Sequence, residues 1–419
     1  MKNILTFLPL GFYFTALPGY DMIEVANFEM TQEHAGMKFL ILSLGTGGGH
    51  NTAANAVKQA LIERGDEAQV FDCLAIVSPF RSRLVCGTYL GIVRYTPKLF
   101  GVIYSLSFRV ASHRRKSVVY AVNVQNAGRL ADFINKEKPD GVITTHIFGA
   151  QQLTYVKRHN LTDVWMGGVV TDYDVQPFWN ETELDTVFVP EESFIDGYAE
   201  KGMRRDTIVA TGIPVDPSLS EVTDKRQAKL DAGLDPDQRC VVIAGGSMGA
   251  GHMPGAVAAL LRDLPRDVRI VAVCGSNQRL MRRLSRLCRD PRRLQVMGFV
   301  KPLHRLIRAA DIVISKPGGL TSTETFVQRV PLVAVHPIEG VESNNAEYMA
   351  RNSLAACPET NEELSATVNR MLEDPSVSET MLQNQRRLIP KNASRGQYTR
   401  ATGLEALFGG LYLQGQLER

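Results

Sequence analysis

Residues 38–50, KFLILSLGTGGGH, join an apolar, β-prone run to a glycine-rich loop, and residues 51–57 continue it with helix-forming residues. Residues 240–251, CVVIAGGSMGAG, repeat this design in the second half of the chain. Each junction is typical of a strand that ends in glycines and opens a helix, where backbone amides can bind an anion. The equivalent placement of the two loops predicts two α/β domains facing a central cleft.

Length and composition agree with two domains. The chain has 419 residues, 44% of them hydrophobic and 22% charged, which is enough apolar material for two cores and excludes a disordered chain. Its six cysteines are scattered and form no CxxC pair. We therefore expect reduced thiols in a cytoplasmic protein.

Apolar runs alternate with helical periods along most of the chain, which favours parallel sheets built from βαβ units. The breaker-rich stretch 211–218 is the best linker candidate. We expect an N-terminal domain over 37–216, a C-terminal domain over 217–390 and a tail or helix over 391–419. The expected strands are 38–44, 67–72, 140–144, 164–170, 186–189 and 207–210 in the first half, and 240–244, 269–274, 294–297, 311–315 and 331–336 in the second.

Residues 1–36 form a leader of uncertain status. An apolar run after Lys2 loosely resembles a signal-peptide core. Met37, however, stands directly before the first strand, as a natural start would, so we favour an upstream translation artefact or a disordered leader. Elsewhere no run reaches the ~20 apolar residues that a membrane span requires.

Charge is unevenly distributed. The net charge is +3, yet no acidic residue lies between Asp72 and Asp132. Aromatic and aliphatic residues are interleaved with the basic ones, which favours a surface for anionic lipid headgroups over 73–131. An ordinary helical insertion with solvated arginines is the alternative, and nucleic acid is not expected. The nine basic residues are Arg81, Arg83, Arg94, Lys98, Arg109, Arg114, Arg115, Lys116 and Arg129.

A third motif follows the strand expected at 311–315 and reads KPGGLTSTE over 316–324. Thr321 is an N-cap candidate, and Glu324 lies three residues later, as in a capping box. Alternatively, the Glu324 carboxylate accepts hydrogen bonds from a ribose diol while the glycine amides hold a diphosphate.

The motifs GTGGGH, GGSMGAG and SKPGGLTSTE, in this order and spacing, resemble the family 28 glycosyltransferases. From Met37 to about residue 390 the chain looks most like the branch of monogalactosyldiacylglycerol synthases and processive diacylglycerol glucosyltransferases, and TDYDVQPFW at 171–179 resembles a segment of that branch. The resemblance implies a GT-B architecture of two Rossmann-like parallel-sheet domains. It also implies an enzyme on the inner face of the cell membrane that moves a hexose from a UDP-sugar to a diacylglycerol-type hydroxyl.

The resemblance also suggests how the donor is bound. UDP-sugar is the donor substrate, no cofactor is expected, and no His, Cys or Asp cluster has metal-ligand spacing. Helix N-termini and loop amides can stabilise the departing diphosphate without a metal. We assign the diphosphate to Gly246, Ser247, Met248 and Gly249 with Gly318, Gly319 and Thr321, the ribose to Glu324, the uracil to the loop with Phe299 and Val300, and the sugar to Glu342 and Asn345.

His50 and Asp172 are the catalytic candidates. The family pattern favours a role for His50 with the acceptor hydroxyl or the leaving phosphate, although a histidine at a helix start is often structural. Asp172 is a candidate base, or merely caps a loop. Gln176 stands where the branch often has histidine, and Val341 where relatives commonly have glutamine, so the hexose stays undecided.

Three other functions remain open. A dinucleotide-binding oxidoreductase would use Gly45, Gly47 and Asp72, but His50 replaces the last glycine of that fingerprint and the KPGGLTSTE motif has no function there. A UDP-sugar epimerase of the same architecture would need no lipid surface. A noncatalytic, membrane-associated UDP-sugar sensor would bind UDP and turn nothing over.

Overall fold

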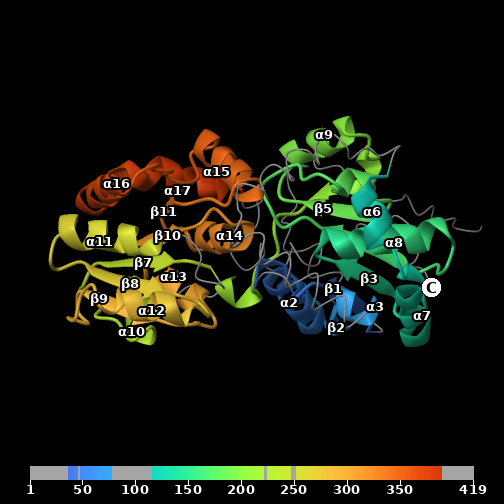
Figure 1. Cartoon of the computed structure of the whole chain (residues 1–419), viewed down its shortest axis with the longest axis horizontal. Helices are drawn as coiled ribbons and strands as arrows, with labels where there is room; N and C mark the ends of the chain where they lie inside the picture. Colours follow the sequence, from blue (N-terminus) through green and yellow to red (C-terminus); the bar gives the residue numbers. More distant parts are fainter. Residues whose placement is uncertain (1–35, 46–47, 78–115, 221–223, 247–251, 389–419) are drawn as a thin grey trace, which may run out of the picture. The chain divides into compact units, whose positions relative to one another are not determined.

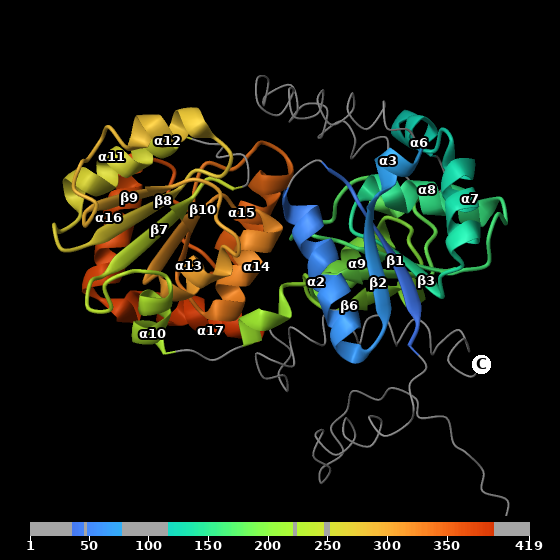
Figure 2. The ribbon, with the colours of Figure 1, turned by 90° about the horizontal axis from the view of Figure 1, so that it is seen from below.

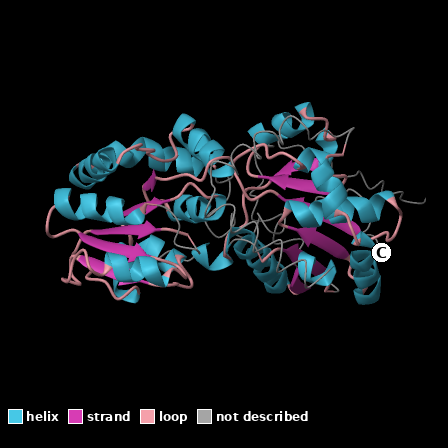
Figure 3. Cartoon of the chain, in the orientation of Figure 1, coloured by secondary structure: helices cyan, strands magenta, loops and turns pink. Residues whose placement is uncertain are grey.

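The computed structural model describes residues 36–45, 48–77, 116–220, 224–246 and 252–388, and from Met37 onward these belong to one compact unit. They form two parallel sheets, each enclosed by helices on both faces (Figures 1 and 3). The protein is thus an α/β protein with two parallel-sheet domains, as the sequence predicts. Every strand of the two sheets lies within one of the expected ranges.

The first sheet has the strand order β2-β1-β3-β4-β5-β6, and all its pairs are parallel. The inner strands are buried on both faces, so their sequences are almost continuously apolar. The strands are β1 (Lys38–Ser43), β2 (Glu67–Asp72), β3 (Gly141–Thr144), β4 (Trp165–Val169), β5 (Thr186–Val189) and β6 (Ile208–Ala210).

Alternate residues of β1 face different helices. Phe39 and Ile41 pack in a cluster with α2, whereas Leu40 and Leu42 pack in a cluster with α7 and α8. Figure 2 shows α2 on one side of β1 and β2, with α3, α7 and α8 on the other. The helices of this half are α2 (Gly48–Arg64), α3 (Cys73–Val77), α6 (Val118–Asn123), α7 (Ala127–Glu137), α8 (Ile147–Arg158) and α9 (Ser193–Glu200).

The second sheet has the strand order β11-β10-β7-β8-β9 and is also parallel throughout. Val241 and Ile243 of β7 pack with α11 and α16, and Val242 and Ala244 pack with α13 and α14. The strands are β7 (Cys240–Ala244), β8 (Arg269–Val273), β9 (Leu294–Met297), β10 (Ile312–Ser315) and β11 (Leu332–Ala334). The helices are α10 (Lys225–Asp231), α11 (Met253–Asp263), α12 (Gln278–Leu284), α13 (His304–Ala309), α14 (Gly319–Gln328), α15 (Val341–Arg351), α16 (Asn361–Glu373) and α17 (Glu379–Arg387).

Several expectations fall on residues that the structure does not describe. The leader, the tail over 391–419 and most of the basic segment lie outside the described residues. Among the helices that are described, none is long and apolar enough to cross a membrane. The domain boundaries at 216 and 390 stay predictions.

Candidate active site

His50 lies in the first turn of α2, and its ring is fixed through Nδ1. This nitrogen is 2.8 Å from the carbonyl oxygen of Thr145 and 3.1 Å from the Thr171 hydroxyl, and the Thr145 hydroxyl donates to the His50 carbonyl at 3.0 Å. Because a carbonyl oxygen can only accept, Nδ1 carries the hydrogen. In the neutral ring the lone pair is therefore on Nε2, which is the form that a general base needs.

The surroundings of His50 favour that neutral form. Burial lowers the pKa of His50, while the negative charge of Asp172 and the bond to Thr145 act in the opposite direction. The ring of His146 meets it edge-on, with 4.5 Å between the ring centroids. Burial and His50 lower the pKa of His146 well below its usual value, and its Nδ1 accepts from the Phe148 amide. Burial thus favours the neutral form of both rings.

Asp172, which follows β4, is held by an amide on each carboxylate oxygen. Oδ1 accepts from Asn345 Nδ2 at 3.0 Å, and Oδ2 accepts from Gln176 Nε2 at 2.7 Å. The Trp179 indole donates to Gln176 Oε1 at 3.1 Å, which fixes the amide so that its NH₂ group points at Asp172. Gln176 is therefore a relay between Trp179 and Asp172, a role that the sequence did not show.

The segment after β4 makes close contacts with α14 and α15. Asn344 Nδ2 donates to Asp174 at 2.9 Å, and the hydroxyls of Tyr173 and Thr323 are 2.8 Å apart. A Cβ at Gly319 would lie 1.9 Å from the carbonyl oxygen of Thr171, so only glycine fits there. The segment with the catalytic candidate Asp172 and the third motif thus lie side by side, although more than a hundred residues separate them in the sequence.

Glu324 is in the middle of α14, and the capping box expected for it is wrong. Gly318 is the N-cap, with extended backbone at φ −79° and ψ 143°, so the helix begins before Thr321. Thr321 is in the first turn, where its carbonyl accepts from Thr325 at 2.7 Å. Glu324 is 8% exposed, and burial together with the charge of Asp216 raises its pKa to about 7. Because Glu324 caps no helix, the role expected for its buried carboxyl group in binding the ribose stays a prediction.

Glu342 at the start of α15 is paired with a lysine that the sequence analysis did not select. Lys316 Nζ is 2.6 Å from Glu342 Oε1, and the amide of Ile338 donates to Oε2 at 2.8 Å. Lys316 follows β10 directly and begins the third motif. The sequence signal that could have identified Lys316 is its place between a strand and a pair of glycines, where a cation can meet an anionic ligand.

The structure describes only some of the remaining residues that the sequence assigns to the site. Ser247, Met248 and Gly249 lie outside the described residues, and Gly246 has the positive φ of 70° that favours glycine. Phe299 is 65% exposed after β9, and Val300 is partly buried against the core. Within the described ranges no group of three or more His, Cys, Asp or Glu side chains could hold a metal ion.

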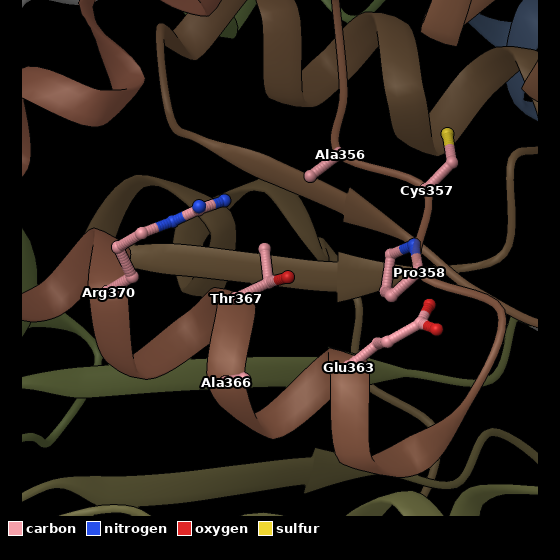
Figure 4. Close-up of a pocket in the computed structure, with 7 residues that line it drawn as sticks. All are labelled: Ala356, Cys357, Pro358, Glu363, Ala366, Thr367 and Arg370. Atoms are coloured by element: carbon pink, nitrogen blue, oxygen red, sulfur yellow. The ribbon is translucent and has the colours of Figure 1, made fainter.

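A hollow of about 400 Å³ lies away from these residues, beside α16 (Figure 4). Burial raises the pKa of the Cys357 thiol in its wall to about 11, so this thiol is not a reactive nucleophile near pH 7. The hollow contains none of the expected site residues. Its lining is Ala356, Cys357, Pro358, Glu363, Ala366, Thr367 and Arg370.

Solved structures share this fold. The calicheamicin glycosyltransferase CalG4 aligns with a TM-score of 0.59 at 14% identity, over 91% of this chain and 100% of that one. Staphylococcus aureus MnaA, solved with UDP, aligns with a TM-score of 0.57 at 15% identity, over 90% and 97%. Anabaena Alr3699/HepE, solved with UDP and glucose, aligns with a TM-score of 0.51 at 14% identity, over 90% and 100%. These likenesses establish the GT-B fold.

Sequence comparison is more specific. Residues 50–215 match monogalactosyldiacylglycerol (MGDG) synthase, and residues 240–396 match the glycosyltransferase family 28 C-terminal domain. The processive diacylglycerol beta-glucosyltransferase of Bacillus pumilus is 26% identical over 363 residues, which cover 85% of this chain and 92% of that protein. Its namesake from Bacillus subtilis is 25% identical over 361 residues, with the same coverage. The chain therefore belongs to the family 28 glycosyltransferases, in the branch of monogalactosyldiacylglycerol synthases and processive diacylglycerol glucosyltransferases.

Proposed function

We propose that this protein transfers a hexose from a UDP-sugar to the hydroxyl of a diacylglycerol-type lipid at a membrane surface. The observation that carries the proposal is the neutral His50 ring, fixed through Nδ1 and placed in the electrostatic field of Asp172. The names of the relatives support the lipid acceptor and favour UDP-glucose over UDP-galactose as the first donor to try. The structural neighbours solved with UDP support the nucleotide.

In the proposed reaction the lipid hydroxyl attacks the anomeric carbon from the side opposite the UDP, which inverts its configuration. The bond from the lipid oxygen to that carbon forms while the bond to the phosphate oxygen breaks. The hydroxyl proton passes to His50 Nε2 or to the Asp172 carboxylate, and UDP leaves with the bonding electrons. Asn345 and Gln176 hold Asp172 in place throughout.

Donor binding is proposed to use the elements that meet at α14. Glu324 accepts from the ribose hydroxyls, the amides at Gly318 and Gly319 and in the second glycine loop hold the diphosphate, and backbone groups at Phe299 and Val300 bind uracil. Because backbone amides supply the stabilisation of the departing charge, we propose that no metal ion is needed. Transfer that persists in excess EDTA supports this point, and transfer that EDTA abolishes contradicts it.

Removing the relay to Asp172 is expected to slow transfer. The variant Gln176→Leu takes away one hydrogen bond to a carboxylate, worth about 1.5–3 kcal/mol, so kcat falls roughly 10- to 100-fold. The dissociation constant for UDP is expected to stay the same, because the described hydrogen bonds of Gln176 are with Asp172, Trp179 and the Tyr198 hydroxyl. Gln152→Leu is the control, since it removes another buried amide of the same domain. Equal losses of kcat in both variants would show that Gln176 is merely structural.

Within the described residues of the proposed membrane surface, 73–77 and 116–131, the exposed large apolar side chains lie on α6. Val118 is 78% exposed and Val122 is 56% exposed, one helical turn apart. Lys116 is not available to lipid, because its ammonium pairs with Glu183 and the Glu181 carbonyl, and Arg129 donates to the Val77 carbonyl. Arg129 is nevertheless exposed, so the lipid charges are proposed to meet Arg129 together with the seven basic residues between 81 and 115, which lie outside the described residues.

Charged residues on α6 are expected to weaken vesicle binding. The double variant Val118→Asp/Val122→Asp removes two apolar side chains, each worth about 1 kcal/mol on partial burial, and adds charge of the wrong sign for anionic lipid. We expect the partition coefficient onto anionic vesicles to fall at least about tenfold in cosedimentation. Ile62→Asp is the control, because Ile62 is 44% exposed on α2. Unchanged partitioning of the double variant would remove α6 from the surface.

The epimerase is the second candidate, because the neighbours of the same fold include UDP-N-acetylglucosamine 2-epimerases. The two reactions differ in the bond that breaks. Inversion at C2 must break a C–H bond, so a 2-epimerase incorporates deuterium from D₂O into the sugar, whereas the transferase does not. Deuterium at C2 of recovered UDP-N-acetylglucosamine would favour the epimerase over the transferase.

A further inference from the structure

Two lysine–carboxylate pairs lie at opposite ends of β10. At its amino end, Lys229 Nζ is 2.9 Å from Asp311 Oδ2, which also accepts from the Cys240 amide. At its carboxyl end, Lys316 Nζ is 2.6 Å from Glu342 Oε1. The first pair joins α10 to the sheet. The second lies at the end where parallel α/β sheets bind their ligands.

Lys316 reaches over the beginning of the second glycine loop. A Cβ at Gly246 would lie 3.4 Å from Lys316 Cε, so the absence of a side chain there leaves room for the lysine. Lys316 also lines a small cavity of about 10 Å³, with Gly245 and His336 among its other walls. The Nε2 atom of His336 is buried there without a hydrogen-bond partner. A ring nitrogen without a hydrogen-bond partner and a cation thus lie at one loop.

Each carboxylate oxygen of Glu342 has a hydrogen-bond partner while this pair exists. One carboxylate oxygen accepts from Lys316 and the other from the Ile338 amide. Both side chains are largely buried, at 14% and 16% exposure, so neither charge is well solvated without the other. A sugar hydroxyl that replaces the ammonium group on Glu342 Oε1 would therefore leave Lys316 in need of another anion.

We propose that Lys316 binds the diphosphate of the donor and that Glu342 takes the place of that diphosphate in the empty protein. On donor binding the ammonium group exchanges the carboxylate for phosphate oxygens, and the released Glu342 Oε1 accepts a hydroxyl of the sugar. The inference rests on the proposed function, since it names the residue that recognises the diphosphate of the same UDP-sugar. An ammonium group with three donors can serve a phosphate while the Ile338 amide keeps Glu342 in place.

The exchange predicts opposite effects for the two partners. Lys316→Gln loses a charged contact to phosphate, so the dissociation constant for UDP rises about 10- to 100-fold, while that for uridine stays unchanged. Glu342→Gln removes the competitor for Lys316, so UDP binds more tightly, by about threefold or more, while transfer slows because a sugar contact is lost. A pair that is only structural would give changes of the same sign in both variants.

Isothermal titration calorimetry of the full chain with UDP and with uridine tests this, with Lys229→Gln as the control for loss of a lysine–carboxylate pair beside β10. The expected result is weaker UDP binding by Lys316→Gln alone and tighter UDP binding by Glu342→Gln. Weaker UDP binding by Glu342→Gln, or an unchanged ratio of UDP to uridine affinity in Lys316→Gln, overturns the exchange. If Lys316→Gln does not fold, the sign of the Glu342→Gln effect decides. If the unaltered protein binds no UDP, the proposed function itself fails.

Discussion

Replacing His50 by alanine is expected to lower kcat/KM for glycosyl transfer about 10³-fold. The variant loses the Nε2 lone pair that the Thr145 carbonyl keeps available by holding the hydrogen on Nδ1. Binding of UDP is expected to change little, because the described contacts of His50 are with Thr145, Thr171 and His146. Steady-state kinetics with a lipid acceptor, together with a UDP titration, measure both quantities.

The pH profile gives an independent check on His50. Burial lowers its pKa below 6.5, so the ring is deprotonated at neutral pH and kcat/KM falls only as the pH drops through that lowered value. His159→Ala is the matched control, since that ring bonds a carbonyl of its own helix, at 2.9 Å from Tyr155. A His50→Ala variant with nearly full activity, beside an inactive Asp172→Asn variant, would make Asp172 the base and His50 structural.

Glu324→Gln is expected to stabilise the empty protein and to weaken UDP binding at the same time. The folded-state pKa of Glu324 is raised from 4.5 to about 7, so folding opposes ionisation of this carboxyl. The cost is absent below pH 4.5, grows as the pH rises and is complete above pH 7, where it reaches about 3 kcal/mol. Removing the charge therefore raises the free energy of unfolding at pH 8 and leaves it nearly unchanged at pH 4.5.

The affinity for UDP is expected to fall in Glu324→Gln, although the stability of the empty protein rises. A carboxylate that accepts from two ribose hydroxyls is worth about 1.5–3 kcal/mol, so the dissociation constant for UDP rises roughly 10- to 100-fold. Chemical denaturation at two pH values and a UDP titration measure both effects. Glu347→Gln is the control, because Glu347 is exposed and paired with Arg351 on α15. Unchanged UDP affinity in Glu324→Gln would refute the ribose assignment.

The sheets could be predicted because their local signals agree with one another. A run such as residues 240–244 is apolar throughout, short, and bounded by a glycine loop, which is what a doubly covered parallel strand requires. The placement of Asp172 after β4 and of Glu324 on the helix after β10 followed from the same alternation. The first turn of α14 did not, because the extended backbone at Gly318 starts the helix earlier than the Thr321 signal suggested.

The contacts that define the site depend on residues far apart in sequence. Asn345 and Asp172 are 173 positions apart in the sequence, and no local pattern predicts their hydrogen bond. In the sequence Gln176 stands out only because it replaces a histidine, since its role depends on the direction in which the Trp179 indole points. The role of Lys316 is not visible in the sequence either. It depends on the space beside Gly246 and on the ion pair with Glu342, which only the folded chain brings together.

The central claim is the transfer of a hexose to a lipid. The most direct test is to incubate the purified full chain with anionic vesicles that contain diacylglycerol, in turn with UDP-glucose, UDP-galactose and UDP-N-acetylglucosamine, and to analyse the lipid extract by mass spectrometry. The proposed function predicts a hexosylated diacylglycerol with one of the two UDP-hexoses, and its loss in His50→Ala. Binding of UDP without a glycosylated lipid from any donor would contradict it.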